Sequence, residues 1–381
     1  MSLRDELRSL EVPGAADAEE RTWSVVRAAH AERLRAPRRR RLSVPAVAFA
    51  VAAALAAAAL SPPGNAVLGS VRDALAPGAK HARAALVTLP AQGRVLVEAP
   101  SGAWIVSEDG SKRRLGAYRD ATWSPHGLYV AAVHGHDLVA LEPNGTVRWT
   151  LARTPAPRLP SWNGPDGYRI AYLSGSTLRV VVGNGTGDRV LARGVLAVRP
   201  AWQPGPQHVL AYARLDGTIV VRAADTGRTL WTRRWPVLPT QLAWSGDGRK
   251  LLVLAPTRVR VYGVSGRVVG ADAPAHAVAA AFRPGSNVVV EVRRRANQSE
   301  AIVLDTGATL FVGPGRVDGL AWSPDGRWLL LAWRSADQWL FQRVEPRRRA
   351  VLAFSAVSTA FDPSGTTPAD FPRLAGWCCG S

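Results

Sequence analysis

Short apolar runs alternate with polar, glycine-bearing turns along the chain from about residue 84 onward. In the clearest copy, Leu320–Trp322 precedes the turn Ser323–Gly326, and the apolar run Trp328–Leu331 follows it. The proline of this turn presets φ for the first central position, and its glycine tolerates a positive φ. Because the apolar runs on both sides supply two antiparallel partners, this stretch predicts a β-hairpin.

Imperfect copies of this hairpin recur about every 40 residues. An aromatic residue ends the first apolar run of each copy: Trp123, Trp162, Trp202, Trp244, Phe282, Trp322 and, less regularly, Phe361. A period near 40 residues with four predicted strands per repeat is typical of β-propellers. We therefore predict an all-β fold, a seven-bladed β-propeller over residues 84–365, with six or eight blades as alternatives. The run 351–361 is predicted to close the ring by joining the degenerate first unit, and residues 366–381 to form a C-terminal tail.

The first 83 residues have a different pattern. Residues 1–41 carry apolar positions at helical spacing, which predicts a short α-helical segment. Residues 42–60 contain no charge, and 19 residues suffice to cross a bilayer as one transmembrane helix. Because Arg38–Arg41 directly precede this run, residues 1–41 are predicted to be cytoplasmic and the propeller to lie outside the cell membrane. Residues 61–83 are predicted to form a linker with a short amphipathic helix. A cleaved signal peptide is the alternative interpretation of the apolar run.

Arginine dominates the charge, since 48 Lys and Arg against 29 Asp and Glu give a net charge of +19. The scarcity of lysine is typical of a GC-rich genome and favours a bacterial source. The positive charge favours an acidic partner, either a protein or an anionic polymer of the cell envelope. We expect no nucleic-acid binding, because the arginines are scattered and no recognition helix accompanies them. Cys378 and Cys379 are adjacent, so a bridge between them would be strained, and a flexible tail or an intermolecular disulfide is expected.

Two sets of residues resemble known propeller repeats. The run Trp322–Gly326, with weaker versions at Trp123–Gly127 and Trp244–Gly248, is similar to the repeat of TolB-like and other WD-repeat-like propellers. The run Ala223–Trp231 resembles the tryptophan-docking repeat of pyrroloquinoline-quinone-type propellers, which include BamB-like proteins. Both resemblances imply a propeller over about residues 84–350. They say little of function, since propellers host enzymes, receptors and scaffolds alike.

The sequence carries little catalytic chemistry. It contains no Gly-x-Ser-x-Gly elbow of an α/β-hydrolase, and acidic ligands for a metal-bound quinone are few, so no cofactor and no enzyme activity are expected. His134 and His136 form a close pair that is better explained by a solvated turn than by a metal site. The repeat aromatics are predicted to pack between blades. Candidate ligand contacts are the residues outside this register, Trp235, Trp339 and Trp377, together with the cluster Arg293, Arg294 and Arg295.

These observations predict a membrane-anchored, extracytoplasmic, non-enzymatic propeller that binds a protein or an envelope polymer. The alternative is a transmembrane signalling regulator. In that hypothesis, the helical segment 1–41 binds a sigma or transcription factor and the propeller is the external sensor. The absence of a His-Cys-Cys zinc signature from the sequence distinguishes the chain from many anti-sigma regulators.

Overall fold

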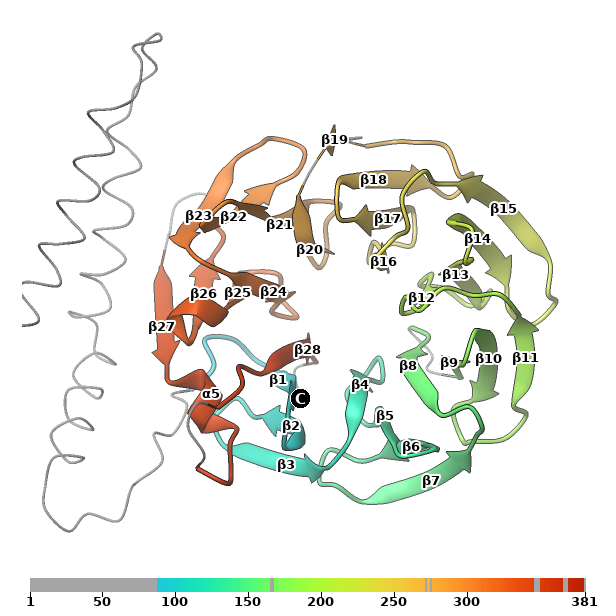
Figure 1. Ribbon diagram of the computed structural model, residues 1–381, viewed down its shortest axis with the longest axis horizontal. Coiled ribbons are helices and arrows are strands. Elements are labelled where there is room, and N and C mark those ends of the chain that lie inside the picture. Colours follow the sequence, from blue (N-terminus) through green and yellow to red (C-terminus); the bar gives the residue numbers. More distant parts are fainter. Residues whose placement is uncertain are drawn as a thin grey trace, which may run out of the picture. The chain divides into compact units, whose positions relative to one another are not determined.

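The computed structural model describes residues 88–164, 168–270, 273–274, 276–345, 350–365 and 369–379. These residues form seven four-stranded antiparallel sheets arranged as a ring around a central axis (Figure 1). The prediction of an all-β, seven-bladed propeller is confirmed, and six and eight blades are excluded. The predicted helical segment, transmembrane helix and linker lie outside the described residues. No helix in the described part of the chain has the length and apolar character needed to span a membrane.

The strands of each blade run in sequence order from the channel outward in blades 2 to 4. Blade 2 contains β4 (Arg119–Trp123), β5 (Val130–His134), β6 (Asp137–Leu141) and β7 (Val147–Ala152). Blade 3 contains β8 (Pro157–Trp162), β9 (Arg169–Ser174), β10 (Thr177–Val182) and β11 (Arg189–Ala192). Blade 4 contains β12 (Ala201–Trp202), β13 (Val209–Ala213), β14 (Thr218–Ala223) and β15 (Thr229–Arg234).

The same order holds in blades 5 to 7. Blade 5 contains β16 (Gln241–Trp244), β17 (Lys250–Ala255), β18 (Arg258–Gly263) and β19 (Ala273–Pro274). Blade 6 contains β20 (Ala277–Phe282), β21 (Val289–Arg295), β22 (Gln298–Val303) and β23 (Thr309–Pro314). Blade 7 contains β24 (Val317–Trp322), β25 (Trp328–Trp333), β26 (Gln338–Arg343) and β27 (Val351–Ser355), with the short 3-10 helix η1 (Arg334–Ala336) between β25 and β26.

Blade 1 combines the two ends of the described chain. Its inner strand is β28 (Arg373–Cys378), which pairs with β1 (Arg94–Ala99), and β2 (Gly102–Val106) and β3 (Lys112–Gly116) complete the sheet. The ring is therefore closed by hydrogen bonds between the last and the first strand, which leaves no inner edge unpaired.

The prediction that residues 351–361 close the ring is wrong. Residues 351–361 form the outer strand β27 and the short helix α5 (Val357–Ala360), and the closing strand lies in the predicted tail. Phe361 belongs to no strand, because its side chain is buried beside α5 and packs against Trp104 and Trp339. The connection through α5 lengthens the last repeat, so the closing strand starts later than the 40-residue period predicts.

The repeat aromatics share one register. Each ends the inner strand of its blade and lies opposite the second strand at an equivalent apolar residue: Trp123 at Val130, Trp162 at Ile170, Trp202 at Leu210, Trp244 at Leu251, Phe282 at Val289 and Trp322 at Leu329. Trp377 lies opposite Val95 in the same way. The seventh repeat aromatic is therefore Trp377, which the sequence analysis placed outside the register.

Neighbouring blades are joined by apolar packing and by indole hydrogen bonds. One apolar cluster joins Ala211 and Val221 of blade 4 to Leu251 and Val253 of blade 5, all fully or almost fully buried. Among the repeat aromatics, the Trp202 Nε1 donates to the Ser161 carbonyl at 2.9 Å and the Trp244 Nε1 donates to the Ala201 carbonyl at 3.2 Å. Each of these bonds reaches the inner strand of the preceding blade, and burial of the rings removes apolar surface from water.

Two outer-strand tryptophans dock onto glycines of the next blade. The Nε1 groups of Trp149 and Trp231 donate to the carbonyls of Gly183 and Val264, each at 2.9 Å. A Cβ atom added to Gly185 would lie 2.8 Å from the Trp149 ring, and one added to Gly266 would lie 2.7 Å from the Trp231 ring. Both turns therefore require glycine, because any side chain would displace the indole.

Cys378 and Cys379 are joined by a disulfide, which corrects the expectation of a flexible tail or an intermolecular bridge. The pair directly follows the residue that completes the ring, Trp377. The Cys379 sulfur lies 3.0 Å from the Pro125 carbonyl of blade 2. The end of the described chain is therefore held by the pairing of β28 with β1 and by this contact with blade 2.

Candidate functional site

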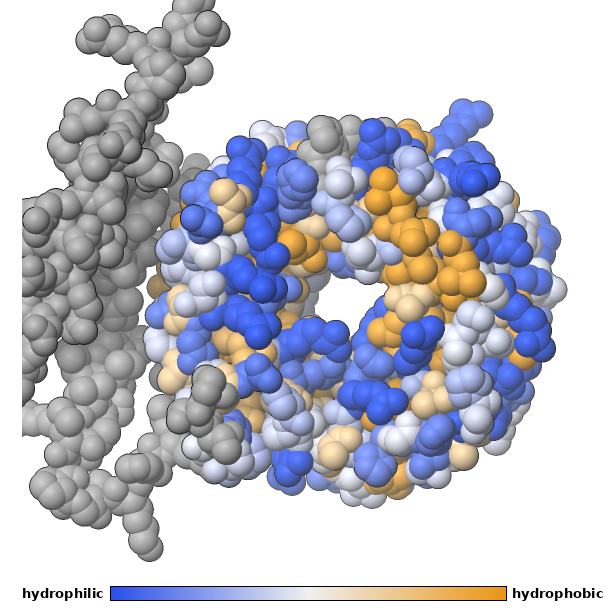
Figure 2. Space-filling view, viewed as in Figure 1, coloured by the Kyte–Doolittle hydropathy of each residue, from blue (hydrophilic) through white to orange (hydrophobic). Residues whose placement is uncertain are grey.

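The ring has two faces that carry different connections. Turns between the first and second strands and between the third and fourth strands of each blade lie on one face, which we call the turn face. Turns between the second and third strands and the connections from blade to blade lie on the other, which we call the crossover face. Figure 2 shows an opening through the centre of the ring. Loops at such faces are where propellers place binding residues.

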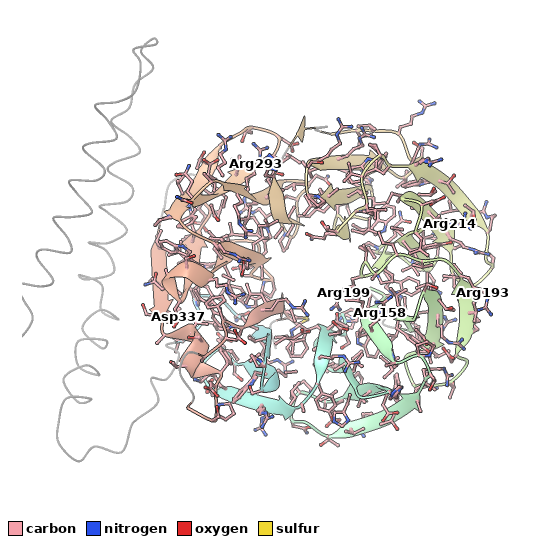
Figure 3. The ribbon with its side chains drawn as sticks, in the orientation of Figure 1. Arg158, Arg193, Arg199, Arg214, Arg293 and Asp337 are labelled. Atoms are coloured by element: carbon pink, nitrogen blue, oxygen red, sulfur yellow. A yellow bond between two sulfur atoms is a disulfide. The ribbon has the colours of Figure 1, made fainter. Side chains whose placement is uncertain are left out.

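The predicted cluster Arg293, Arg294 and Arg295 is paired with carboxylates. Arg293 pairs with Glu291, Arg294 with Asp318 at 3.1 Å, and Arg295 with Glu300 at 3.4 Å. The Glu291 side chain is fully buried, and this burial raises the pKa of its carboxyl, an effect that the charge of Arg293 opposes. Arg293 lies in blade 6, far around the ring from Arg193 and Arg214 (Figure 3). The cluster therefore offers an acidic ligand less charge than the sequence predicts.

The predicted indole contacts are core residues. Trp339 is fully buried, Trp235 is 2% exposed and Trp377 is 8% exposed. Trp339 packs against Phe361 and Trp377 against Phe341, while the Arg260 guanidinium lies over the Trp235 ring. None of these three indoles presents a ring face to solvent, so we correct their assignment from ligand contact to packing.

The charged groups near the central channel are held by backbone carbonyls and carboxylates of neighbouring residues. Arg199 and Arg158 lie beside the opening (Figure 3), and they donate to the carbonyls of Pro160 at 2.5 Å and Gly175 at 2.7 Å. Burial lowers the pKa of Arg199, and the nearby carboxylates oppose this effect. Arg373 pairs with Glu98 at 2.5 Å and with Asp120 at 3.7 Å.

The described residues contain no group of three or more His, Cys, Asp or Glu side chains able to hold a metal ion. The two histidines of the close pair in the sequence contact different groups. The His136 Nδ1 lies 3.3 Å from the Arg153 carbonyl, and the His134 ring packs edge-on against Tyr118. Both residues lie at a turn of the crossover face, as the sequence predicts.

An exposed apolar surface lies on the crossover face, where the loops of blades 4 and 5 meet. We call it the crossover patch, and it consists of the exposed Leu215 and Leu238 together with the half-buried Leu196 and Val237. Leu215 is 57% exposed and Leu238 is 50% exposed. A methyl carbon of Leu238 lies 3.6 Å from the Cβ position of Gly217, in the same turn as Leu215. Figure 2 shows this apolar area beside the central opening, over blades 4 and 5.

Two arginines border the crossover patch. Arg193 and Arg214 are exposed, and Arg214 is held in place by a bridge between its backbone and that of Val195. Neither guanidinium forms an ion pair with any residue in the described part of the chain. Asp216 is the neighbouring acid; backbone and side-chain hydrogen bonds from Thr218 lower its pKa, and the charge of Arg214 does so to a lesser degree. The patch therefore joins exposed leucines to available positive charge.

Sequence reasoning missed the crossover patch, although a signal for it exists. Leu215 stands in the turn Arg214–Gly217 between two strands, where the equivalent turns carry His134–His136 or Ser174–Ser176. A leucine in a short polar turn is not explained by strand burial, and it becomes informative when a second exposed leucine, Leu238, lies beside it. Leu238 could not be found in this way. It lies in the connection between two blades, and these connections differ in length, so Leu238 has no equivalent position in the other blades.

No protein-family model and no curated protein matches the chain. The chain is similar to one in the crystal structure of a Mitotic Checkpoint Complex, with a TM-score of 0.50 and 18% identity, over 62% of this chain and 76% of that chain. It is also similar to a chain of Kuenenia stuttgartiensis hydrazine synthase, with a TM-score of 0.45 and 16% identity, over 58% of this chain and 75% of that chain. The first likeness supports the fold alone, and the protein is a seven-bladed β-propeller.

Proposed function

We propose that this protein is a non-enzymatic scaffold that binds an acidic protein through the crossover patch. The observation that carries the proposal is the pairing of exposed Leu215 and Leu238 with Arg193 and Arg214, which have no ion-pair partner among the described residues. Protein interfaces combine an apolar centre with a polar rim, and arginine is enriched in them. An anionic envelope polymer would be attracted by the charge alone, whereas the leucines favour a folded or folding protein surface.

The scaffold is proposed to be a bacterial cell-membrane protein, with residues 42–60 as its single span and the propeller outside the cytoplasm. The uncharged run and the arginines before it support this topology. Docking of Trp149 and Trp231 onto glycines supports kinship with pyrroloquinoline-quinone-type repeats, and the Trp322–Gly326 turn supports kinship with TolB-like repeats. Protease added to intact spheroplasts should digest the propeller and leave residues 1–41 protected. Protection of the propeller would overturn the topology.

The binding proposal is tested by charge reversal on the patch. Full-length protein and the double variant Arg193→Glu, Arg214→Glu are used to capture proteins from envelope extract at low salt. The control is Arg228→Glu, because Arg228 is also exposed but lies on the turn face. We expect one acidic protein to bind the parent protein and the control and to be lost from the double variant. Raising the salt towards 1 M, where the Debye length is about 3 Å, should weaken this binding.

Each failure of this experiment has a distinct meaning. Capture that is equal for the parent protein and the double variant would contradict the patch as the binding surface. Capture of an anionic polymer in place of a protein, retained when Leu215 is changed to Ser, would replace the protein partner by a polymer. An acidic protein that is lost from the double variant and weakened by Leu215→Ser would support both parts of the proposal.

A further inference from the structure

A groove of about 720 Å³ lies on the turn face, between blades 2 and 3. Four aromatic side chains line it: Tyr129 and Trp149 from blade 2, and Trp162 and Tyr168 from blade 3. The rings of Tyr129 and Trp162 are stacked, with centroids 6.4 Å apart and planes inclined by 21°. Leu128 stands at the rim. We call this surface the aromatic groove, and its volume lies in the usual range for ligand sites, about 300 to 1,000 Å³.

The repeat itself shows that this surface departs from the rest of the ring. Leu128 and Tyr168 occupy the last position of the turn between the first and second strands, and each is 62% exposed. In four other blades this position, defined by the same backbone hydrogen bond across the turn, carries a polar residue: His208, Arg249, Asn287 or Arg327. Only the two blades that border the aromatic groove replace it by a large apolar or aromatic side chain.

Burial does not explain this replacement. A side chain that is 62% exposed gains little from leaving water, and arginine at the same position is compatible with the turn in blades 5 and 7. Two exposed apolar residues on adjacent blades, both facing one concavity, are the usual mark of a binding surface. The ring therefore holds its own comparison: the position before the second strand is equivalent, although the turn of blade 3 is one residue longer than that of blade 2, and only blades 2 and 3 place a large apolar or aromatic side chain there.

Several polar groups of the aromatic groove are engaged within the protein, and its lining also includes the exposed His126. The Ser124 hydroxyl accepts from the Tyr129 N–H at 2.9 Å, and the Asn184 side-chain oxygen accepts from the Thr186 N–H at 3.1 Å. Arg148 is neutralised by its ion pair with Glu142. Trp149 cannot offer its Nε1, which donates to the Gly183 carbonyl. In a chain with a net charge of +19, the groove presents ring faces and little free charge.

We propose that the aromatic groove binds an extended, proline-containing segment of a partner protein. Proline rings are apolar, uncharged and fixed in direction, and polyproline II segments bind aromatic-lined grooves because little conformational entropy is lost. Charge complementarity favours the same occupant, since a neutral groove on a basic protein selects against the acidic partner of the crossover patch. A sugar could also stack on these rings, and the groove is distinguished from a glycan site by the experiment that follows.

The inference is tested by panning short, phage-displayed random peptides against the full-length protein. The peptide that is enriched is then synthesised with a fluorescent label and titrated by fluorescence anisotropy. Leu128→Arg and Tyr168→Arg are the test variants, because arginine occupies the corresponding position in blades 5 and 7. Val264→Arg is the matched control, since it also adds an exposed arginine on the turn face but lies in blade 5, outside both proposed surfaces. Thermal melts confirm that each variant is folded.

We expect the enriched peptides to contain proline, and each groove variant to weaken their binding about tenfold, which corresponds to about 1.4 kcal/mol. The control variant should bind the peptide as the parent protein does. Enriched peptides without proline, or equal binding by Leu128→Arg and the parent protein, would overturn the inference. Binding of a neutral oligosaccharide that both groove variants abolish would overturn it in favour of a glycan. None of these outcomes depends on capture of the acidic partner, so the two proposals can fail separately.

Discussion

Asp188 links two neighbouring blades through a small polar cluster. Its carboxylate accepts hydrogen bonds from the Tyr172 hydroxyl at 2.6 Å, the Arg179 Nε at 2.9 Å and the Arg153 Nε at 2.9 Å. Burial alone would raise the pKa of Asp188, but the bonds from Arg179, Tyr172 and Arg153 outweigh it and hold this pKa below its ordinary value. Burial, assisted by the bond to Asp188, raises the pKa of Tyr172 to about 12.

Replacing Asp188 by Asn should destabilise the fold by about 3 kcal/mol at pH 7, because the guanidinium groups of Arg153 and Arg179 lose their counter-charge. The folded pKa lies below the unfolded value near 3.8, so the stabilisation is present above pH 3.8 and is lost as the pH falls through the folded value. Urea denaturation of the parent protein and the variant at pH 7, and again at a pH well below 3.8, measures both quantities.

Asp305 is the matched control, since its carboxylate is exposed in a turn and its change to Asn should alter stability by no more than about 0.5 kcal/mol. A loss for Asp188→Asn that is the same at both pH values would contradict the electrostatic origin. It would point to packing of the polar cluster.

At the scale of single elements, the turn between the third and fourth strands is where one blade holds the next. Gly266 and Gly307 both adopt a positive φ, +73° and +67°. A methyl group at Gly266 would meet the Trp231 ring, whereas nothing lies within 4 Å of that position at Gly307. The two glycines therefore separate backbone strain from collision with the indole.

We expect Gly307→Ala to cost about 1 kcal/mol, the strain of a left-handed alanine. Gly266→Ala should cost about 3 kcal/mol, because it adds displacement of the docked Trp231. The denaturant midpoints of the two variants measure the difference in stability. The fluorescence of Trp231 is obtained by subtracting the signal of matching proteins that also carry Trp231→Phe. Equal costs at the two positions would show that the indole moves away freely and that docking contributes little.

Closure of the ring depends on β28. Removal of residues 373–381 should abolish cooperative unfolding, because β1 then becomes an exposed inner edge and the apolar contacts of Trp377 with its neighbours are lost. Trp377→Ala is the milder variant and should cost about 4 kcal/mol. Removal of residues 380–381 alone is the control and should leave the calorimetric transition unchanged. A sharp transition in the chain that ends at residue 372 would show that six complete blades and an open first blade suffice.

These elements also show how far the sequence predicts the fold. The sequence alone predicts the positions of Trp123, Trp162 and Trp202, because each ends a buried inner strand and their constant spacing can be read along the chain. Trp377 could not be placed in this way, because the connection through α5 puts it 55 residues after Trp322. Its role is visible only when β28 pairs with β1, a contact between the two ends of the described chain.

The candidate sites were harder to predict than the fold, for a physical reason. Trp235 and Trp339 were chosen because they break the repeat, but a tryptophan that breaks a repeat can equally be a core residue, as both are. Leu128 and Tyr168 are the more informative departures, since an apolar residue replaces a polar one at an exposed position of the turn. Exposure at that position follows from ring geometry, which a single repeat does not reveal.

At the scale of the whole molecule, the two proposed surfaces lie on opposite faces of one rigid ring. The crossover patch is carried by loops of blades 4 and 5, and the aromatic groove by turns of blades 2 and 3. The first surface combines exposed leucines with arginines, and the second presents aromatic rings with little free charge. A closed ring separates them by its own thickness and needs no hinge, which is what a scaffold for two partners requires.

The acidic protein and the proline-containing peptide should therefore bind at the same time without competition. With the acidic partner immobilised and the propeller captured on it, the labelled peptide should bind with the affinity that it has for the free propeller. Arg193→Glu with Arg214→Glu should remove the propeller from the surface, whereas Leu128→Arg should leave it captured but unable to bind peptide. Mutual exclusion of the two ligands would contradict the assignment of opposite faces. An affinity for peptide that changes on capture would mean that the ring transmits a signal between its faces, because coupling between two sites appears as a change in affinity.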